Sequence, residues 1–198
     1  MIKNPIPQAS EELQSRAIGI IYGNYKPNSS DSLNKGIITD ENEFVLDTVV
    51  LGKALPLLKK YIDFENKYYW IVYPRNKNSN LLHLQIAGVW DPNNFKKIDS
   101  TRLKKSHDLL NSLHLRDNLF SIRGKLIFIN TSQKELIVKI SPSQINKSLK
   151  NKSFKIFLKG EIPMSAINSF VSLEVTRKNN TLYTDEFEII TPKSSDLD

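Results

Sequence analysis

The chain has 198 residues, of which 39% are hydrophobic and 25% charged, so it can fold as one large or two small domains and is too apolar to be disordered throughout. It has no cysteine, which excludes disulfides and thiolate metal sites and favours a reducing compartment. The first residues lack the apolar core of a signal peptide, and no apolar run reaches the length of a membrane span. We therefore expect a cytoplasmic protein.

The first 92 residues predict a lead-in and a β-rich unit. Residues 1–15 are predicted to form a loose lead-in, and residues 16–92 a unit of five strands and one helix. Apolar residues at helical spacing in 51–62 predict a helix that starts near Pro56 or is kinked there. Gly19 and Gly23 are suited to bends in a long first strand, which is followed by a polar loop at 27–35. The strands are predicted at 16–26, 36–39, 43–50, 68–75 and 81–90.

The rest of the chain predicts a connector, a second β unit and a tail. Residues 93–118 form a basic connector with helical pieces such as 103–113, residues 119–190 the second unit, and residues 191–198 an acidic tail. Residues 161–169, after the third strand of this unit, are too few for more than one helical turn. Its strands are predicted at 120–130, 135–141, 154–160, 170–178 and 181–190.

Both units have an element order that resembles the OB-fold. A long bent first strand with a helix between the third and fourth strands is typical of that five-stranded barrel, and the resemblance covers 16–90 with the helix and 119–190 without it. The fold class implied is mainly β, with two tandem five-stranded barrels. OB-folds bind oligonucleotides and oligosaccharides, so the resemblance implies a nucleic-acid-binding protein. The segments Arg16–Gly19, Trp70–Arg75 and His83–Trp90 also resemble an uncharacterised family of bacterial proteins, which implies no activity.

No pattern in the chain predicts catalysis. The three histidines are His83, His107 and His114, and the last two are seven residues apart, whereas a helical metal pair needs a spacing of about four. Gly52-Lys53 and Gly124-Lys125 lack the upstream glycine and the following hydroxyl residue of a phosphate-binding loop. We therefore expect a protein that is not an enzyme, with no catalytic residue, no metal site and no cofactor.

The net charge of +7 is concentrated in one third of the chain. Residues 96–160 contain 15 basic and 4 acidic residues, whereas residues 161–198 contain 3 basic and 7 acidic residues. Strand alternation places Phe120, Ile122, Gly124, Leu126 and Phe128 on one side of the first strand of the second unit. The same alternation predicts an outer surface with a cluster of cations around an exposed ring: Arg123, Lys125, Lys139, Lys155 and Lys159 around Phe157.

That surface has three readings. Nucleic acid could bind there, because lysines neutralise phosphates and a ring can stack on a base. The lysines could instead line a solvated face, or they could contact an acidic protein partner. The connector and the loop before the third strand would extend the positive field through Lys96, Lys97, Arg102, Lys104, Lys105, Lys147, Lys150 and Lys152.

The first unit is neutral and aromatic. A barrel core can take some of its rings, which are Tyr22, Tyr25, Tyr68, Tyr69, Trp70, Tyr73 and Trp90. Tyr25, Tyr73, Arg75 and Lys77 lie near strand ends, where they could hold a short single strand or form a protein interface. The interface is the favoured reading for this unit.

The sequence therefore predicts a non-catalytic protein that binds single-stranded nucleic acid, with RNA favoured, at low sequence specificity through the basic second unit. The alternative is an interaction adaptor that docks on a larger assembly through its aromatic first unit and its sheet edges. No membrane partner is expected.

Overall fold

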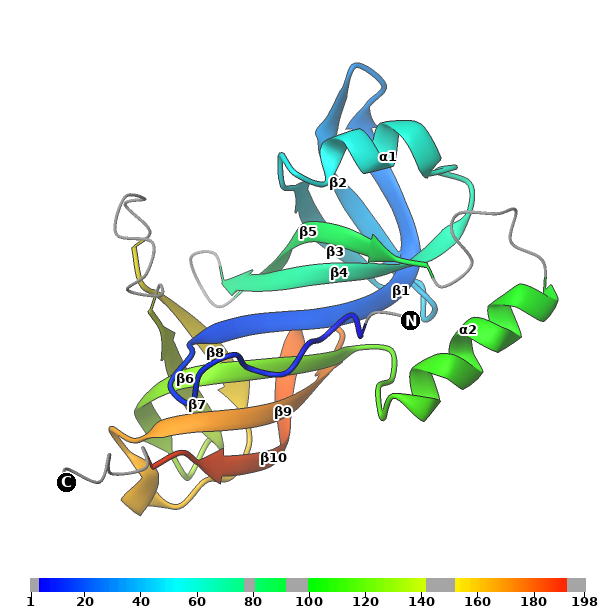
Figure 1. Cartoon of the computed structure of the whole chain (residues 1–198). Helices are drawn as coiled ribbons and strands as arrows, with labels where there is room; N and C mark the ends of the chain where they lie inside the picture. The colour runs from blue at the N-terminus through cyan, green and yellow to red at the C-terminus, as the bar shows by residue number, and fades with distance from the viewer. Residues whose placement is uncertain (1–3, 77–80, 92–99, 142–151, 192–198) are drawn as a thin grey trace, which may run out of the picture. The chain divides into compact units, whose positions relative to one another are not determined.

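The structure is a computed structural model that describes residues 4–76, 81–91, 100–141 and 152–191 (Figure 1). It divides into two compact units. The first comprises Met1–Pro7 with Ile18–Leu119, and the second comprises Gln8–Ala17 with Phe120–Asp198. Within the described residues, no helix combines the length and the apolar character needed to cross a membrane.

The first unit is a closed barrel of five strands, coloured blue to green in Figure 1. The strand order is β2-β3-β5-β4-β1, and pairing of β2 with β1 closes the barrel. β3 and β5 run parallel, whereas β1 runs antiparallel to both β2 and β4. The strands are β1 (Arg16–Ser29), β2 (Ser32–Asp40), β3 (Val45–Val50), β4 (Lys67–Asn76) and β5 (Leu82–Trp90). Helix α1 (Leu55–Tyr61) follows β3 and has Pro56 in its first turn, where proline needs no N–H partner.

Strand β1 pairs with different strands along its two halves. Gly19 to Asn24 pair with β4, and Gly23 to Ser29 pair with β2. Gly23 belongs to both ladders, and a Cβ at this position would lie 2.5 Å from the Thr39 carbonyl oxygen. The bend predicted from the glycines therefore requires a residue without a side chain at Gly23.

The polar loop predicted at 27–35 is wrong for most of its length. β1 continues to Ser29 and β2 begins at Ser32, so Ser30 and Asp31 alone connect the two strands. Pro27 is tolerated because the pairing register shifts between Pro27 and Ser29, and proline is accepted in a strand where the ladder is already irregular.

The first unit has two apolar layers. Inside the barrel, Trp70 and Tyr25 are fully buried, and the Trp70 indole N–H donates to the Gly23 carbonyl oxygen at 2.9 Å. Leu58 of α1 is fully buried as well. The outer layer lies beneath helix α2 (Ser100–Ser112), and its buried members are Ile6, Ile20, Tyr22, Tyr69, Trp90, Leu110 and Leu119. The helix predicted within the connector is therefore confirmed, and it packs as part of the first unit.

The second unit repeats the topology of the first, in the strands coloured green to red in Figure 1. The strand order is β6-β7-β8-β10-β9, with an additional pairing between β6 and β9. β8 and β10 run parallel, as β3 and β5 do in the first unit. The strands are β6 (Leu119–Asn130), β7 (Glu135–Ile140), β8 (Phe154–Lys159), β9 (Phe170–Lys178) and β10 (Thr181–Ile189). A single 3-10 turn (Met164–Ala166) replaces the helix, as predicted.

Both units therefore have the strand order of the OB-fold, and the predicted fold class is confirmed. In the second barrel, Gly124 occupies the place where β6 coils, and a Cβ there would overlap the Lys139 carbonyl oxygen. The turn after β8 closes this barrel with Ile162 and Ala166, both buried.

The close approach at Gly23 predicts an unequal effect of two Gly→Ala substitutions in the first unit. We expect Gly23→Ala to lower the free energy of unfolding by about 1–3 kcal/mol, because the Cβ overlaps the β2 backbone. Gly52→Ala is the control, because a Cβ there meets no atom within 4 Å. Chemical denaturation of both variants measures the difference, and equal stabilities would contradict the explanation given for the bend in β1.

Candidate nucleic-acid interface

Three lysines form a row across the outer face of the second barrel. Lys125 on β6 is the cross-strand neighbour of Lys139 on β7, and Lys139 is the neighbour of Lys155 on β8. Adjacent strands are about 4.7–4.9 Å apart, so the row crosses the strands at close spacing. All three side chains are exposed. The structure thus brings together three of the five cations predicted for this surface.

Within the described residues, the charges of this row are not balanced by an acidic partner. Like charges directly opposite each other on neighbouring strands are destabilising, and this row contains two such pairs. Across residues 4–76, 81–91, 100–141 and 152–191, none of the three lysines forms an ion pair. The row therefore offers positive charge to an external anion.

An apolar row lies next to the lysines on the same face. Ile137 of β7 is the cross-strand neighbour of Phe128 on β6 and of Phe157 on β8. Phe128 is 41% exposed, and Phe157 is half-buried at its predicted outward position. Two rings thus flank one aliphatic side chain beside the cations.

The predicted inward position of Phe128 is wrong. The register of β6 against β7 shifts between Leu126 and Phe128, so the extra residue Ile127 reverses the facing of the residues that follow. Simple alternation cannot reveal such a bulge. The second exposed ring of the face was therefore missed.

Lys159 does not act with the lysine row. Its ammonium group lies 3.0 Å from a Glu135 carboxylate oxygen and donates to the Gln133 carbonyl oxygen at 3.2 Å. Glu135 is the direct cross-strand neighbour of Lys159, an arrangement that alternation alone did not disclose. The charge predicted to bind ligand is therefore paired, and its role here is to fix the β6–β7 turn.

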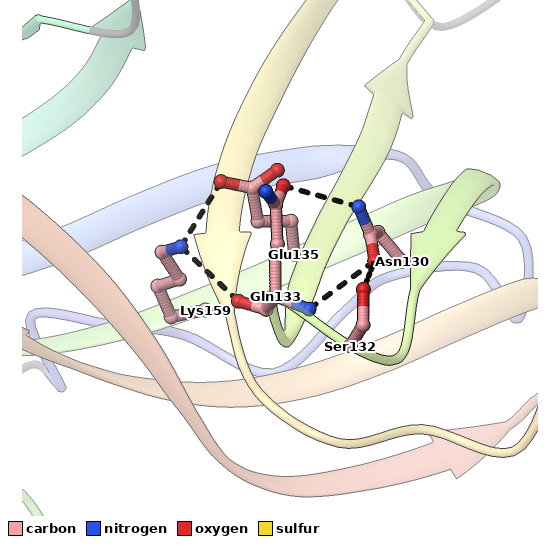
Figure 2. A network of polar contacts seen from close by, with 5 residues as sticks. All are labelled: Asn130, Ser132, Gln133, Glu135 and Lys159. Carbon is pink, nitrogen blue, oxygen red and sulfur yellow. Dashed lines mark hydrogen bonds and ion pairs between the residues drawn. The ribbon is translucent and has the colours of Figure 1, made fainter.

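The β6–β7 turn is held by a polar network (Figure 2). The Asn130 side-chain oxygen accepts from the Ser132 hydroxyl at 2.8 Å and from the Gln133 N–H at 3.2 Å. The Asn130 amide donates in return to the Gln133 side chain at 3.1 Å. Because both strands of the turn are tied together, the turn has a defined shape before any ligand arrives.

A hollow of about 560 Å³ adjoins this turn. Lys134, in the left-handed conformation at φ 52°, forms an ion pair with Glu161, and this contact holds the pKa of the Glu161 carboxyl below its ordinary value. The lining residues are Ile129, Thr131, Gly160, Glu161, Ile162 and Pro163. The β6–β7 turn is therefore bordered by a concave and largely apolar pocket.

Arg123 has a structural position, which corrects the prediction that it binds ligand. One of its amino groups donates to the Ser172 hydroxyl at 2.9 Å, and another donates to the carbonyl oxygen of Glu12. The guanidinium group also lies 5.8 Å from the centre of the Phe170 ring. Arg123 thus joins β6, β9 and the lead-in of the second unit. The pKa of Arg16 is lowered by burial and by the positive charge of Arg123.

Most rings of the first unit are buried, which corrects the prediction that Tyr25 contacts a ligand or a partner. Tyr25 is fully buried, its hydroxyl donates to the Leu33 carbonyl oxygen at 2.9 Å, and burial raises its pKa to about 12. Tyr22, Tyr69 and Trp90 lie under α2. The Tyr69 hydroxyl shares a hydrogen bond with Nδ1 of His107 on that helix. Sequence patterning could not separate a solvent-facing ring from one covered by a later helix.

Of the remaining predicted residues of the first unit, two are described by the structure and one is not. Tyr73 and Arg75 lie two residues apart on β4, and both are half-buried. Arg75 donates to the Pro74 carbonyl oxygen at 2.8 Å, and burial lowers its pKa. Lys77 lies outside the described residues. Tyr73 and Arg75 stay candidates for contact with a ligand.

The cations predicted to extend the field can be placed in part. Lys104 and Lys105 are exposed on α2, and Lys152 is exposed just before β8. The side chains of the others lie outside the described residues, and these are Lys96, Lys97, Arg102, Lys147 and Lys150. Among the residues that the structure describes, no group of three or more His, Cys, Asp or Glu side chains could hold a metal ion.

Comparisons with known proteins find one family model that matches each barrel. The family model for the N-terminal OB-fold domain of the PatR RNA-binding protein matches residues 17–97. The model for the C-terminal cyanobacterial OB-fold-like RNA-binding domain matches residues 122–191. No curated protein sequence matches the chain. Among solved structures, the Ifi202 HINa domain in complex with 20bp dsDNA is 10% identical over 87% of this chain and 91% of its own length, but its TM-score of 0.20 carries no argument.

The like-charge row predicts that a charge reversal stabilises the second unit. Lys139→Glu replaces two repulsive cross-strand pairs by two attractive ones, each worth about 0.2–1 kcal/mol. We expect a higher free energy of unfolding for Lys139→Glu than for wild type in chemical denaturation at low salt. Lys139→Gln, which only removes the repulsion, should lie between them. A Lys139→Glu protein less stable than wild type would show that the three lysines do not repel one another.

Proposed function

We propose that this protein is non-catalytic and binds single-stranded RNA through the outer face of β6, β7 and β8. Its two barrels match the models for the PatR N-terminal OB-fold domain and for the cyanobacterial C-terminal OB-fold-like RNA-binding domain, which supports the proposal. The observation that carries the proposal is the unpaired row Lys125–Lys139–Lys155 beside the row Phe128–Ile137–Phe157. In OB-folds, the face of the second and third strands is a usual ligand surface, and β7 and β8 are those strands here.

The lysine row and the apolar row would contact different parts of the RNA. The lysines neutralise backbone phosphates and release counterions, which supplies affinity independent of sequence. The exposed ring of Phe128 and the outward ring of Phe157 offer surfaces on which bases can stack. Stacking needs bases that are not enclosed in a duplex, so the arrangement favours single strands.

Low sequence specificity follows from the chemistry of these two rows. Ammonium groups bind phosphates of any nucleotide, and a phenyl ring stacks on any base. Sequence selection requires donors and acceptors that match the Watson–Crick edges of splayed bases. The two rows hold no acceptor, and the lysine ammonium groups can donate to phosphates and to the carbonyl oxygens of different bases alike. RNA is favoured over DNA because both matching families are described as RNA-binding.

The lysine row predicts a shallower salt dependence in a triple variant. For Lys125→Ala/Lys139→Ala/Lys155→Ala, we expect the slope of log K against log salt to fall in magnitude by roughly 2, at about 0.7 for each lost contact with a single strand. Fluorescence anisotropy with labelled single-stranded RNA, titrated between about 50 and 200 mM salt, measures the slope.

The matched control removes equal charge from the first unit. Lys35, Lys53 and Lys59 are exposed there, and their triple alanine variant should keep the wild-type slope. An equal loss in both triple variants would mean that net charge, and not the β6–β8 face, governs binding. Absence of RNA binding by the wild-type protein at about 50 mM salt would refute the proposed function.

The apolar row predicts a loss that depends on base stacking. Phe128→Ala/Phe157→Ala should weaken binding of single-stranded RNA by about 5- to 150-fold for each base that loses its ring, from about 1–3 kcal/mol of stacking. Binding to duplex RNA, whose bases are stacked internally, should change much less. The control is Tyr61→Ala, which removes a ring that is 45% exposed on α1. Equal losses on single strands and duplexes would exclude stacking at this face.

A further inference from the structure

Strands β8 and β10 of the second barrel overlap by one residue pair. They run parallel, and the pairing consists of Tyr183 with Lys159, the last residue of β8. The remainder of β10, from Thr184 to Ile189, continues beyond the end of β8 and is paired along its other side with β9. Within the described part of the chain, this stretch of β10 has no second neighbouring strand. Gly160 still packs against Thr184, so the open side of the β10 backbone runs from Glu186 to Ile189.

Backbone alternation shows which groups face this edge. The Ile190 N–H donates to the Phe170 carbonyl oxygen at 2.9 Å, so the polar backbone groups of Ile190 point toward β9. In an antiparallel ladder, successive residues direct these groups to opposite sides. The N–H and C=O groups of Ile189 and Phe187 consequently point toward the open edge, where they can pair with an added strand.

The side chains of the edge fall into an apolar face and an acidic face. Phe187 and Ile189 are each 40% exposed, although their cross-strand partners Leu173 and Val171 are buried in the barrel core. The apolar face of β10 is thus left uncovered past the end of β8. Glu186 and Glu188 alternate with them on the opposite face, and both are exposed.

The acidic face contains a like-charge contact. Glu186 is the direct cross-strand neighbour of Glu174 on β9, so a carboxylate lies opposite a carboxylate on this face. Charge on an edge strand can serve to repel other strands. The exposed Phe187 and Ile189 argue against simple protection of the edge, because they give an incoming strand apolar surface to cover. An added strand with basic side chains on one face and apolar side chains on the other would neutralise the glutamates and cover the exposed apolar residues.

We propose that the open edge of β10 at Glu186–Ile189 binds an extended basic segment of a protein partner, which adds to the barrel as a further strand. Main-chain hydrogen bonds to Phe187 and Ile189 supply affinity, as in other cases of β-strand addition. Lysine or arginine side chains of the partner lie on the face of Glu186 and Glu188, and its alternate apolar side chains cover Phe187 and Ile189. This site is separate from the β6–β8 face and does not depend on RNA binding.

The first test uses a synthetic peptide as the probe. An acetylated, labelled peptide that alternates lysine and valine over about eight residues is titrated with the full-length protein and followed by fluorescence anisotropy. We expect binding that weakens as salt rises, and none for the peptide that alternates glutamate and valine. Glu186→Lys/Glu188→Lys should weaken binding of the lysine peptide by about tenfold or more, since two attractions become repulsions.

The matched control reverses two exposed glutamates of the first unit. Glu41→Lys/Glu65→Lys changes net charge by the same amount, and the affinity for the peptide should stay at the wild-type value. Equal losses in the two double variants, or no binding of the lysine peptide by wild type at low salt, would overturn the proposal. The circular dichroism of each variant confirms that the barrels remain folded.

The second test separates strand addition from simple charge attraction. Two further lysine peptides carry N-methyl groups on alternate residues, one on the odd and one on the even positions. An added strand uses the N–H groups of one set to pair with β10, so one methylated peptide should lose binding and the other should keep it. Equal binding of both methylated peptides would overturn the proposal.

Discussion

Each barrel closes because its first strand pairs on both of its sides, and this requires backbone without a side chain where the strand coils. In the first barrel, Gly23 faces β2 and β4 at once, with the Thr39 carbonyl oxygen in the space that a Cβ would occupy. In the second barrel, β6 pairs with β7 and β9, and Gly124 lies against the backbone of β7. The coil of β6 and the bulge that follows decide which side chains reach the outer face. The position of the candidate interface therefore depends on how this strand is bent.

The sequence was sufficient for the parts of the structure that follow from periodicity. It predicted ten strands, the helix after β3, the single turn in place of a second helix, and the outward direction of Lys125, Lys139 and Lys155. It failed where a contact between distant segments decides the outcome. The position of Phe128 depends on a one-residue bulge, the pairing of Lys159 depends on register, and Tyr25 is buried by elements that alternation does not describe.

On the β6–β8 face, two charged rows lie on either side of the apolar row, and only one of them has a counterion. Glu135 neutralises Lys159 at one end of β7, whereas Lys139 at the other end stands between two further lysines. These strands can thus place a counterion directly opposite a lysine, as Glu135 does for Lys159. On the other side of the barrel, Glu174 and Glu186 form the opposite like-charge pair. Like charges in directly opposite positions repel one another, and a ligand of the other sign would reduce that repulsion. The second barrel consequently has two surfaces on which like charges occupy directly opposite positions on neighbouring strands.

Helix α2 lies in the stretch between two barrels, where inserted or deleted residues are commonly tolerated. Here Leu110 and its neighbours cover Tyr22, Tyr69 and Trp90, so the length and the register of this stretch matter to the first barrel. A deletion of one residue within α2 would turn Leu110 away from the rings and bring a polar neighbour toward them. We therefore expect the segment to keep its length and its apolar positions among relatives, as a protein core does. Insertions and deletions, which are common in interdomain linkers, should be rare in it.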